Sequence, residues 1–284
     1  MKALAEYVVQ GWKNAAKAAF ILGLLPFCGW IGAAVVALIN LRKGFNEGLP
    51  VMLWAGLPSL MAWVYFGDIF SAPLLISAIV GSLVWRRTVS MFAAILSVVA
   101  VSMLVQWLVL FWSPAGLDNL RAIMEQLLEQ SAAMTEVSKG VDSERFIDEM
   151  LNTSYGFSIA SSALVSLFFA RGWQAQLYNP GGFQEEFHNL QIPSYWCVGL
   201  MVCAAIAMQS GGLGVGVALL CAVPMLIAGI ALVHSLVKRL NAPKGVLFGF
   251  YGLAFILGPS LLVPLMFMVV LDSFIDIRGR LSKS

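Results

Sequence analysis

Long apolar runs alternate with short polar connections along most of the chain. Six of these runs approach the roughly 20 residues that a helix needs to cross a bilayer. They cover residues 49–66, 71–85, 88–112, 155–177, 194–209 and 212–237. The pattern therefore predicts an all-α protein, built as a polytopic transmembrane helix bundle.

The two ends of the chain predict broken helices. The run 245–271 contains Pro259 and Pro264, and proline removes a backbone donor from a helix, so this run should be kinked or split into two short pieces. Near the N-terminus, residues 3–25 and 31–41 predict a hairpin of one longer and one shorter helix, interrupted at Pro26. With these pieces we expect about eight membrane helices.

The composition also indicates that lipid surrounds most of the chain. Hydrophobic residues make up 60% of the 284 residues and charged residues 11%, whereas a soluble domain carries about 25% charged residues. This excludes a soluble enzyme, a disordered chain and a secreted disulfide scaffold. We expect one membrane domain over 1–284, with its core spans within 49–237, no removable signal peptide and the lipid bilayer as first partner. No basic stripe is interleaved with aromatics, so no nucleic-acid partner is expected.

Lysine and arginine gather in alternate connections, which predicts the orientation because cytoplasmic loops carry an excess of these residues. The basic connections contain Arg42, Lys43, Arg86, Arg87, Arg171, Lys238, Arg239 and Lys244. We expect them, together with the N-terminus, on the cytoplasmic side of a bacterial inner membrane. The tail after 271 would lie outside if the last run spans once and inside if that run is re-entrant.

The segment 113–154 is the only large extramembrane piece, and the alternation of sides makes it extracytoplasmic. It has eight acidic and three basic residues, and one apolar stripe at helical spacing: Leu117, Leu120, Met124, Leu127, Ser131 and Met134. The insert is interpreted either as a lid or docking surface, or as an amphipathic helix lying across the outer ends of the bundle.

Catalytic chemistry is poorly represented. No acidic residue lies in the middle of the six central runs, so a pump that relays protons through buried carboxylates is not expected. The chain lacks a phosphate-binding loop and a nucleophile motif, and His188 and His234 are its only histidines. Glu185, Glu186 and His188 share one connection, where we favour a solvated charged turn over a metal site or a lipid-modifying centre. We expect no enzyme, no cofactor and no metal.

Two helical stripes have two interpretations each. Ser158, Ser162 and Ser166 follow one another at four-residue spacing, so they either pack against a neighbouring helix or line a polar pocket.

The second stripe consists of small residues that recur every four positions in the first helix, which lets helix backbones approach closely. Its members are Gly11, Ala15, Ala19 and Gly23. It is either a docking face for another membrane protein or a packing face within this bundle.

The connection 171–193 carries the most distinctive motif. Asn179, Pro180, Gly181 and Gly182 predict a tight turn. The further members of the motif are Arg171, Trp173, Tyr178, Phe183 and Glu186, and a second motif, Asp272, Asp276 and Arg278, lies near the C-terminus.

Together these motifs resemble the signature of the YybS-like family of bacterial membrane proteins, whose function is unknown. The chain departs from the family pattern at Gly172 and Phe274, where tryptophan is commoner. That family is similar in turn to the substrate-binding S components of energy-coupling factor transporters and to the rod-shape protein MreD.

The resemblance implies a six-helix core that captures a small molecule, has no ATPase of its own and docks through small residues on its first helix. We therefore expect a non-enzymatic subunit that binds a small molecule or lipid and works with partner membrane proteins. The alternative is a scaffold or assembly factor, similar to MreD, without a ligand.

Overall fold

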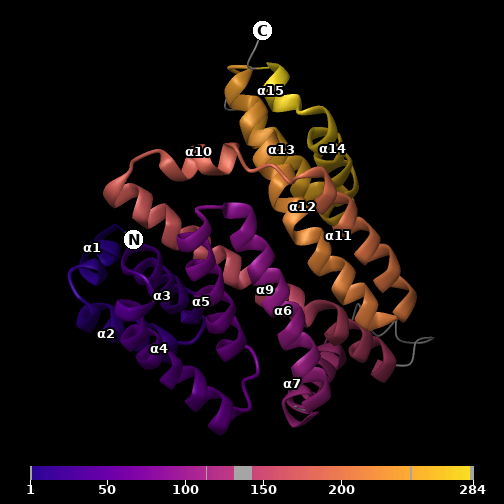
Figure 1. Ribbon diagram of the computed structural model, residues 1–284. Helices are drawn as coiled ribbons and strands as arrows, with labels where there is room; N and C mark the ends of the chain where they lie inside the picture. Colours follow the sequence, from indigo (N-terminus) through magenta and orange to yellow (C-terminus); the bar gives the residue numbers. More distant parts are fainter. Residues whose placement is uncertain (1, 113, 131–142, 244, 282–284) are drawn as a thin grey trace.

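The computed structural model describes residues 2–112, 114–130, 143–243 and 245–281, and every regular element in these ranges is helical (Figure 1). The first half contains α1 (Lys2–Val9), α2 (Trp12–Leu24), α3 (Gly29–Lys43), α4 (Phe45–Phe66), α5 (Ser71–Thr88), α6 (Met91–Trp112) and α7 (Pro114–Gln130). The second half contains α9 (Ser143–Tyr178), α10 (Gly182–His188), α11 (Ser194–Ala207), α12 (Gly212–Arg239), α13 (Gly245–Leu257), α14 (Leu262–Ile275) and α15 (Ile277–Leu281).

Five segments in the described part of the chain are helical, long enough and apolar enough to cross a membrane. They are Phe45–Phe66, Met91–Val109, Arg145–Tyr178, Gly212–Arg239 and Gly245–Ile275. The prediction of a helical, multi-pass membrane protein is confirmed in this form. The number of eight membrane helices is not confirmed, because α2 and α3 have only 13 and 15 residues.

The helices run between two ends of the bundle with opposite charge. One end, which we call the basic end, lies at the top of Figure 1 with α10 and α15. It carries Arg42, Lys43, Arg86, Arg87, Arg171, Lys238, Arg239, Arg278 and Arg280. The other end, which we call the acidic end, carries α7 and the connection that contains Asp68.

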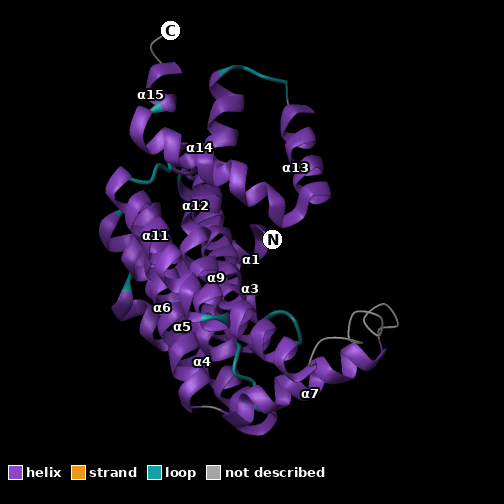
Figure 2. Cartoon of the chain, turned by 90° about the vertical axis from the view of Figure 1, so that its right-hand side faces the viewer, coloured by secondary structure: helices purple, strands orange, loops and turns teal. Residues whose placement is uncertain are grey.

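The last apolar run returns to the end from which it starts. α13 and α14 are separated by a 3₁₀ turn at Gly258–Leu261, where Gly258 has a positive φ of 52° and Pro259 interrupts the backbone bonding. Figure 2 shows α13 leading away from the loop after α12 and α14 coming back to α15. The Arg239 Nη1 donates to the Arg278 carbonyl at 2.9 Å, which fixes the two ends together. The end of α14 thus lies beside the end of α12, as a re-entrant run would place it.

The core is centred on α3, which is apolar all round its circumference, as expected for a helix enclosed by others. Every residue from Ala33 to Ile39 is buried. α13 is equally apolar in sequence, yet none of its described residues is buried. Apolar character alone thus does not tell a core helix from one that faces lipid.

The predicted insert divides between two helices. α7 packs through Leu117, which is buried with Ile69 and Tyr155, while Leu127 is exposed. Ser131 and Met134, the last members of the predicted stripe, lie outside the described residues. Residues 143–154 are not separate from the bundle, because they form the start of the 36-residue helix α9.

Candidate functional site

A difference in helix length creates a pocket at the acidic end. α3 ends and α4 begins at the basic end, but α3 has 15 residues and α4 has 22. At 1.5 Å per residue, the α2–α3 turn stops about 10 Å short of the end of α4. Pro26 and Gly29 mark this turn, so the predicted break in the N-terminal hairpin is what leaves the space open.

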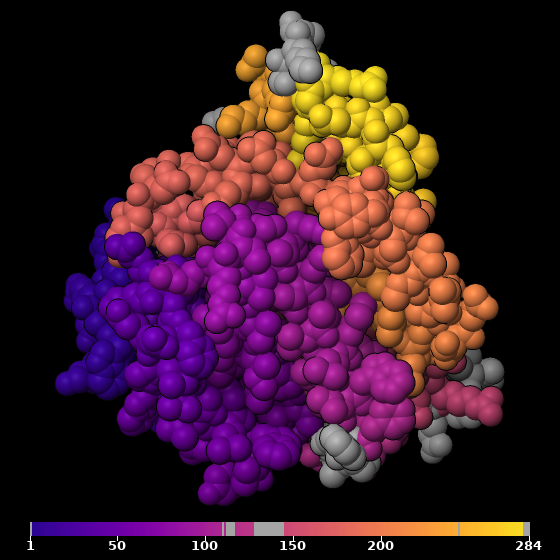
Figure 3. Space-filling model, viewed as in Figure 1, coloured from indigo at the N-terminus to yellow at the C-terminus, as the bar shows by residue number. Residues whose placement is uncertain are grey.

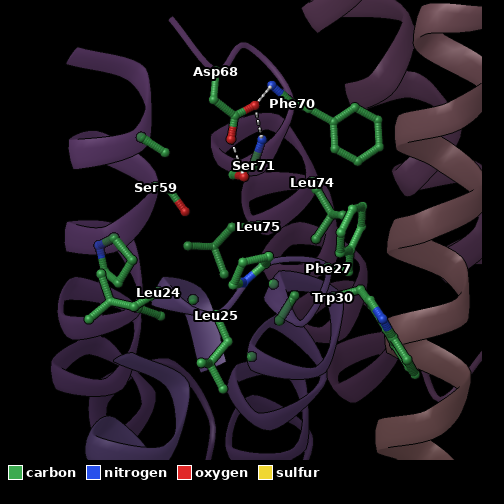
Figure 4. A pocket seen from close by; sticks show the side chains of 18 of the residues that line it. Leu24, Leu25, Phe27, Trp30, Ser59, Asp68, Phe70, Ser71, Leu74 and Leu75 are labelled. Atoms are coloured by element: carbon green, nitrogen blue, oxygen red, sulfur yellow. Dashed lines mark hydrogen bonds between the residues drawn. The ribbon is translucent and has the colours of Figure 1, made fainter. Parts of the chain in front are cut away.

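The resulting pocket has a volume of about 520 Å³, within the range of small-molecule sites. The turn between α2 and α3 forms its floor with Leu24 and Leu25, and the C-terminal half of α4 and the first turns of α5 form its walls (Figure 4). Most of the lining is apolar. Its polar members are Ser59, Asp68, Ser71 and Ser162.

Asp68 is held at the rim by the start of α5. Its carboxylate accepts hydrogen bonds from the Phe70 amide at 2.7 Å, from the Ser71 amide at 3.3 Å and from the Ser71 hydroxyl. A carboxylate is favoured at a helix N-terminus, where free amides and the positive end of the helix dipole meet it. The connection is fixed further by the Tyr155 hydroxyl, which donates to the Ile69 carbonyl.

The three serines of the stripe on α9 have different surroundings. The Ser166 hydroxyl lies 2.8 Å from the Trp30 carbonyl and 2.9 Å from the Ser162 carbonyl, so it joins α9 to α3. Ser162 lines the pocket. Ser158 is half-buried and does not belong to the described lining.

The small-residue stripe is used inside the bundle. Ala15 and Ala19 are completely buried, and a Cβ at Gly23 would come within 2.9 Å of the Pro58 side chain on α4. Gly11 is different, because it lies at the break between α1 and α2 with nothing close to it. The geometry is that of packing within the chain, and a partner that docks on α2 would have to use other residues.

The signature connection closes the basic end. Arg171 makes a two-pronged ion pair with Glu186, through Nε to Oε2 at 2.9 Å and through Nη2 to Oε1. The predicted turn is present, with Gly181 at a φ of 92°, and a Cβ at Gly182 would collide with Asn179. In Figure 3 the connection lies as a continuous layer across the upper end of the purple helices.

The aromatic members of this motif pack beneath that layer. Trp173 is buried, and Phe183 contacts Phe168 with ring centroids 6.0 Å apart. The Arg42 guanidinium lies 4.1 Å from the centre of the Tyr178 ring, a cation–π contact that joins α3 to α9. Each of these contacts is structural.

The C-terminal motif meets the signature connection, which sequence reasoning did not anticipate. The Arg278 Nε lies 3.1 Å from Asp272 Oδ2, and the two side chains are only 5% and 3% exposed. Arg278 Nη1 also donates to the His188 carbonyl at 2.6 Å, and Gln191 Nε2 donates to the Asp272 carbonyl at 2.9 Å. Asp276 takes no part in this pair: it is exposed and accepts from the Gly279 amide.

The two histidines lie at this junction. Their ring centroids are 6.2 Å apart, and His234 Nε2 is 2.8 Å from the Tyr251 hydroxyl. Burial lowers the pKa of His188, and the nearby charges of Lys238, His234, Arg278 and Arg239 add to this effect. Burial also lowers the pKa of Arg278, against the opposing influence of Asp272.

Glu185, Glu186 and His188 do not converge on one point, because Glu186 turns toward Arg171 while His188 faces His234. In the described ranges, no three His, Cys, Asp or Glu side chains are placed to hold a metal ion.

Fold and site together define a helical, multi-pass membrane protein with a pocket at its acidic end. No family model, curated protein or solved structure matches the chain. The resemblance to the YybS-like family therefore stays a prediction.

Proposed function

We propose that this chain is a non-enzymatic subunit of a bacterial inner membrane that binds a small molecule or lipid in the pocket at its acidic end and works with partner membrane proteins. The pocket of about 520 Å³ is the observation that carries the proposal. With the basic end in the cytoplasm, the pocket opens toward the outer face of the membrane. It would thus take its ligand from outside the cell membrane.

The distribution of polar groups favours binding over catalysis. At the basic end the charged side chains are already paired, Arg171 with Glu186 and Arg278 with Asp272. The described pocket lining contains three serines and one carboxylate, with neither histidine nor cysteine. Asp68 is already held by three donors of its own chain. This set can orient a ligand but provides no pair of groups for moving protons.

The exposed apolar surface supports a partner. α13 carries Phe248 and Phe255 at 85% and 92% exposure, and it folds back without crossing the bundle. Lipid covers such a surface, and so does a helix of a second protein. The same surface also favours the alternative function, a scaffold without a ligand. The two functions differ because a scaffold would bind no ligand in the pocket.

A variant that fills the pocket tests the proposal. Gly29 lines the pocket, and apart from its chain neighbours and its own helix backbone no heavy atom lies within 4 Å of the position that a Cβ would take there. Gly29→Leu should therefore occupy the space without straining the fold. Gly56 on α4 has the same freedom but does not line the pocket, which makes Gly56→Leu the matched control. The measurement is thermal unfolding of detergent-purified protein across a small-molecule and lipid panel, with native mass spectrometry for retained compounds.

We expect the wild-type protein and Gly56→Leu to gain thermal stability with at least one compound, since a ligand stabilises the state that binds it. Gly29→Leu should lose that gain. A wild-type protein that retains no compound and responds to none would overturn ligand binding and leave the scaffold function.

A further inference from the structure

The pocket combines aromatic rings with a single charge. Phe27, Trp30, Phe66 and Phe70 all belong to its lining, and Asp68 is the only charged side chain among the lining residues that the structure describes. No lysine, arginine or histidine of the described chain lines it. An aromatic face attracts a cation through the negative potential above the ring, and this attraction grows where water is excluded.

The rings and the carboxylate come from different elements and meet in one space. Figure 4 shows Phe27, Trp30 and Phe70 on the side of the pocket opposite Ser59, with Asp68 above them. Trp30 is fixed from behind by an edge-on contact with Phe169, at a centroid distance of 5.2 Å. Its carbonyl accepts the bond from Ser166. The position of Trp30 is thus set by α9.

Phe27 adds a ring at the mouth. It is 97% exposed and has a φ of 60°, a left-handed conformation that is uncommon for a bulky residue. Such strain persists where the surrounding structure enforces it, and it is found at ligand sites. The turn that ends α2 at Leu24 and starts α3 at Gly29 imposes it here.

The carboxylate of Asp68 is hydrogen-bonded, but no cationic side chain neutralises it. Its three donors are two backbone amides and a hydroxyl, and all three are neutral. The end of the α5 dipole supplies about half of a positive charge, which leaves the site net negative. An anionic ligand would be repelled there, whereas a cation would find a counter-ion.

The surroundings of the mouth carry the same sign. α7 lies beside this connection, because a Cβ at Gly67 would collide with Asn119. Arg121 on α7 is engaged by two carboxylates, those of Asp118 and Asp148. A third carboxylate, that of Glu125, lies beside Arg121 and Asp148, and Arg145 is the basic residue of α9 at this end. A surface of this sign concentrates cations near the opening.

We infer that the ligand of this pocket is an organic cation with an apolar body, held by Asp68 as counter-ion and by the aromatic rings around Trp30. This inference rests on the proposed function, since it names the chemical class of the ligand of the same pocket. The apolar walls accept the body of the ligand, and the cationic group lies at the rim near Asp68.

Two isosteric probes and an anion of similar size separate charge from size. Benzyltrimethylammonium is the cation, neopentylbenzene is its neutral isostere, and phenylacetate is an anion of similar size. Wild-type protein in a non-ionic detergent should bind the cation about tenfold more tightly than the neutral isostere, as expected for a cation–π contact with a counter-ion. Phenylacetate should produce no thermal shift.

Two variants assign the preference to its residues. In Asp68→Asn the side-chain oxygen can still accept the Phe70 amide, so the turn should fold while the preference for the cation falls to about the level of the neutral probe. Glu47→Gln, which changes an exposed carboxylate on α4 outside the pocket, should keep the preference. Trp30→Leu should weaken the binding of the cation more than that of the neutral probe. This variant provides an independent test should Asp68→Asn fail to fold.

The outcomes distinguish this inference from the proposed function. If cation and neutral isostere bind equally and Gly29→Leu abolishes both, the pocket binds ligands but the ligand class is wrong. If no probe binds and Gly29→Leu changes nothing across the wider panel, the proposed function itself falls. A preference for the cation that survives in both Asp68→Asn and Trp30→Leu would also overturn the inference.

Discussion

The basic and acidic ends of the bundle use their polar residues in opposite ways. At the basic end, Arg171 is paired with Glu186 and Arg278 with Asp272. At the acidic end, Asp68 is bound by neutral donors of its own turn and lies at the rim of an open pocket. The more conspicuous motifs of the sequence thus close the structure, and the less conspicuous residues leave room for a ligand.

The difference follows from the cost of burying charge. A charged side chain away from water needs a partner with good geometry, so a buried arginine brings several specific residues with it, and these form a recognisable motif. An apolar pocket requires only that walls of suitable size surround a space. Residues such as Leu25 and Leu75 satisfy this requirement without any distinctive pattern.

The largest effect is expected from breaking the buried pair of the basic end. Asp272→Ala should lower the free energy of unfolding by about 3–5 kcal/mol, because Arg278 would remain buried without its counter-charge. Unfolding of the purified protein by a denaturing detergent, followed by circular dichroism, measures the loss.

The neighbouring variant Asp276→Asn is the control for this measurement. Asp276 is exposed and has a φ of 50°, a conformation that asparagine adopts readily, so a change of about 0.5 kcal/mol or less is expected. Equal losses in the two variants would contradict the distinction between a closed basic end and its solvent-exposed rim.

A smaller effect should follow from acidification, again at the basic end. Because the pKa of His188 lies below its ordinary value of 6.5 in the folded protein, the unfolded chain takes up the proton first as pH falls. The contribution of His188 to stability is complete above pH 6.5 and declines below it. The melting temperature should therefore fall between pH 7 and pH 5.

His188→Gln keeps the backbone carbonyl that Arg278 binds and removes the titrating ring. Its melting temperature should change less steeply over the same pH range than that of the wild-type protein. Parallel pH profiles of the two proteins would show that the acid sensitivity arises elsewhere in the molecule.

The smallest effect is expected at the acidic end. The Arg121 side chain is 41% exposed, and exposed ion pairs contribute about 1 kcal/mol or less. Arg121→Ala should cost no more than this despite losing two bonds, and the cost should shrink further at high salt. A loss as large as that of Asp272→Ala, measured in the same way, would remove the contrast between the ends.

A small part of the candidate site was within reach of the sequence, and its assembly was not. Pro26 and Gly29 predict the break that forms the pocket floor, and Ser162 was predicted as a residue of packing or of a pocket. Trp30, Ser59 and Asp68 gave no comparable signal, because one aromatic, one serine or one aspartate at the end of an apolar run is common. Only the difference in length between α3 and α4 brings them together.

The two conspicuous motifs show the same limit. The sequence identifies the turn at Asn179 and the acidic and basic residues from Asp272 onward as separate features. Their contact through Arg278 and the His188 carbonyl depends on the return of α14 to the end where α12 stops. Pro259 indicates a break in that run but does not state the direction in which the chain continues.

The sequence by itself determined that lipid surrounds most of the protein, which segments are helical and how charge alternates between connections. Each of these depends on the nature of residues close together in the chain. The tertiary structure alone decided which apolar helix is enclosed, where the last run turns back and which residues surround the pocket. These outcomes depend on contacts between helices far apart in sequence, whose apolar surfaces are chemically alike and are told apart only by shape.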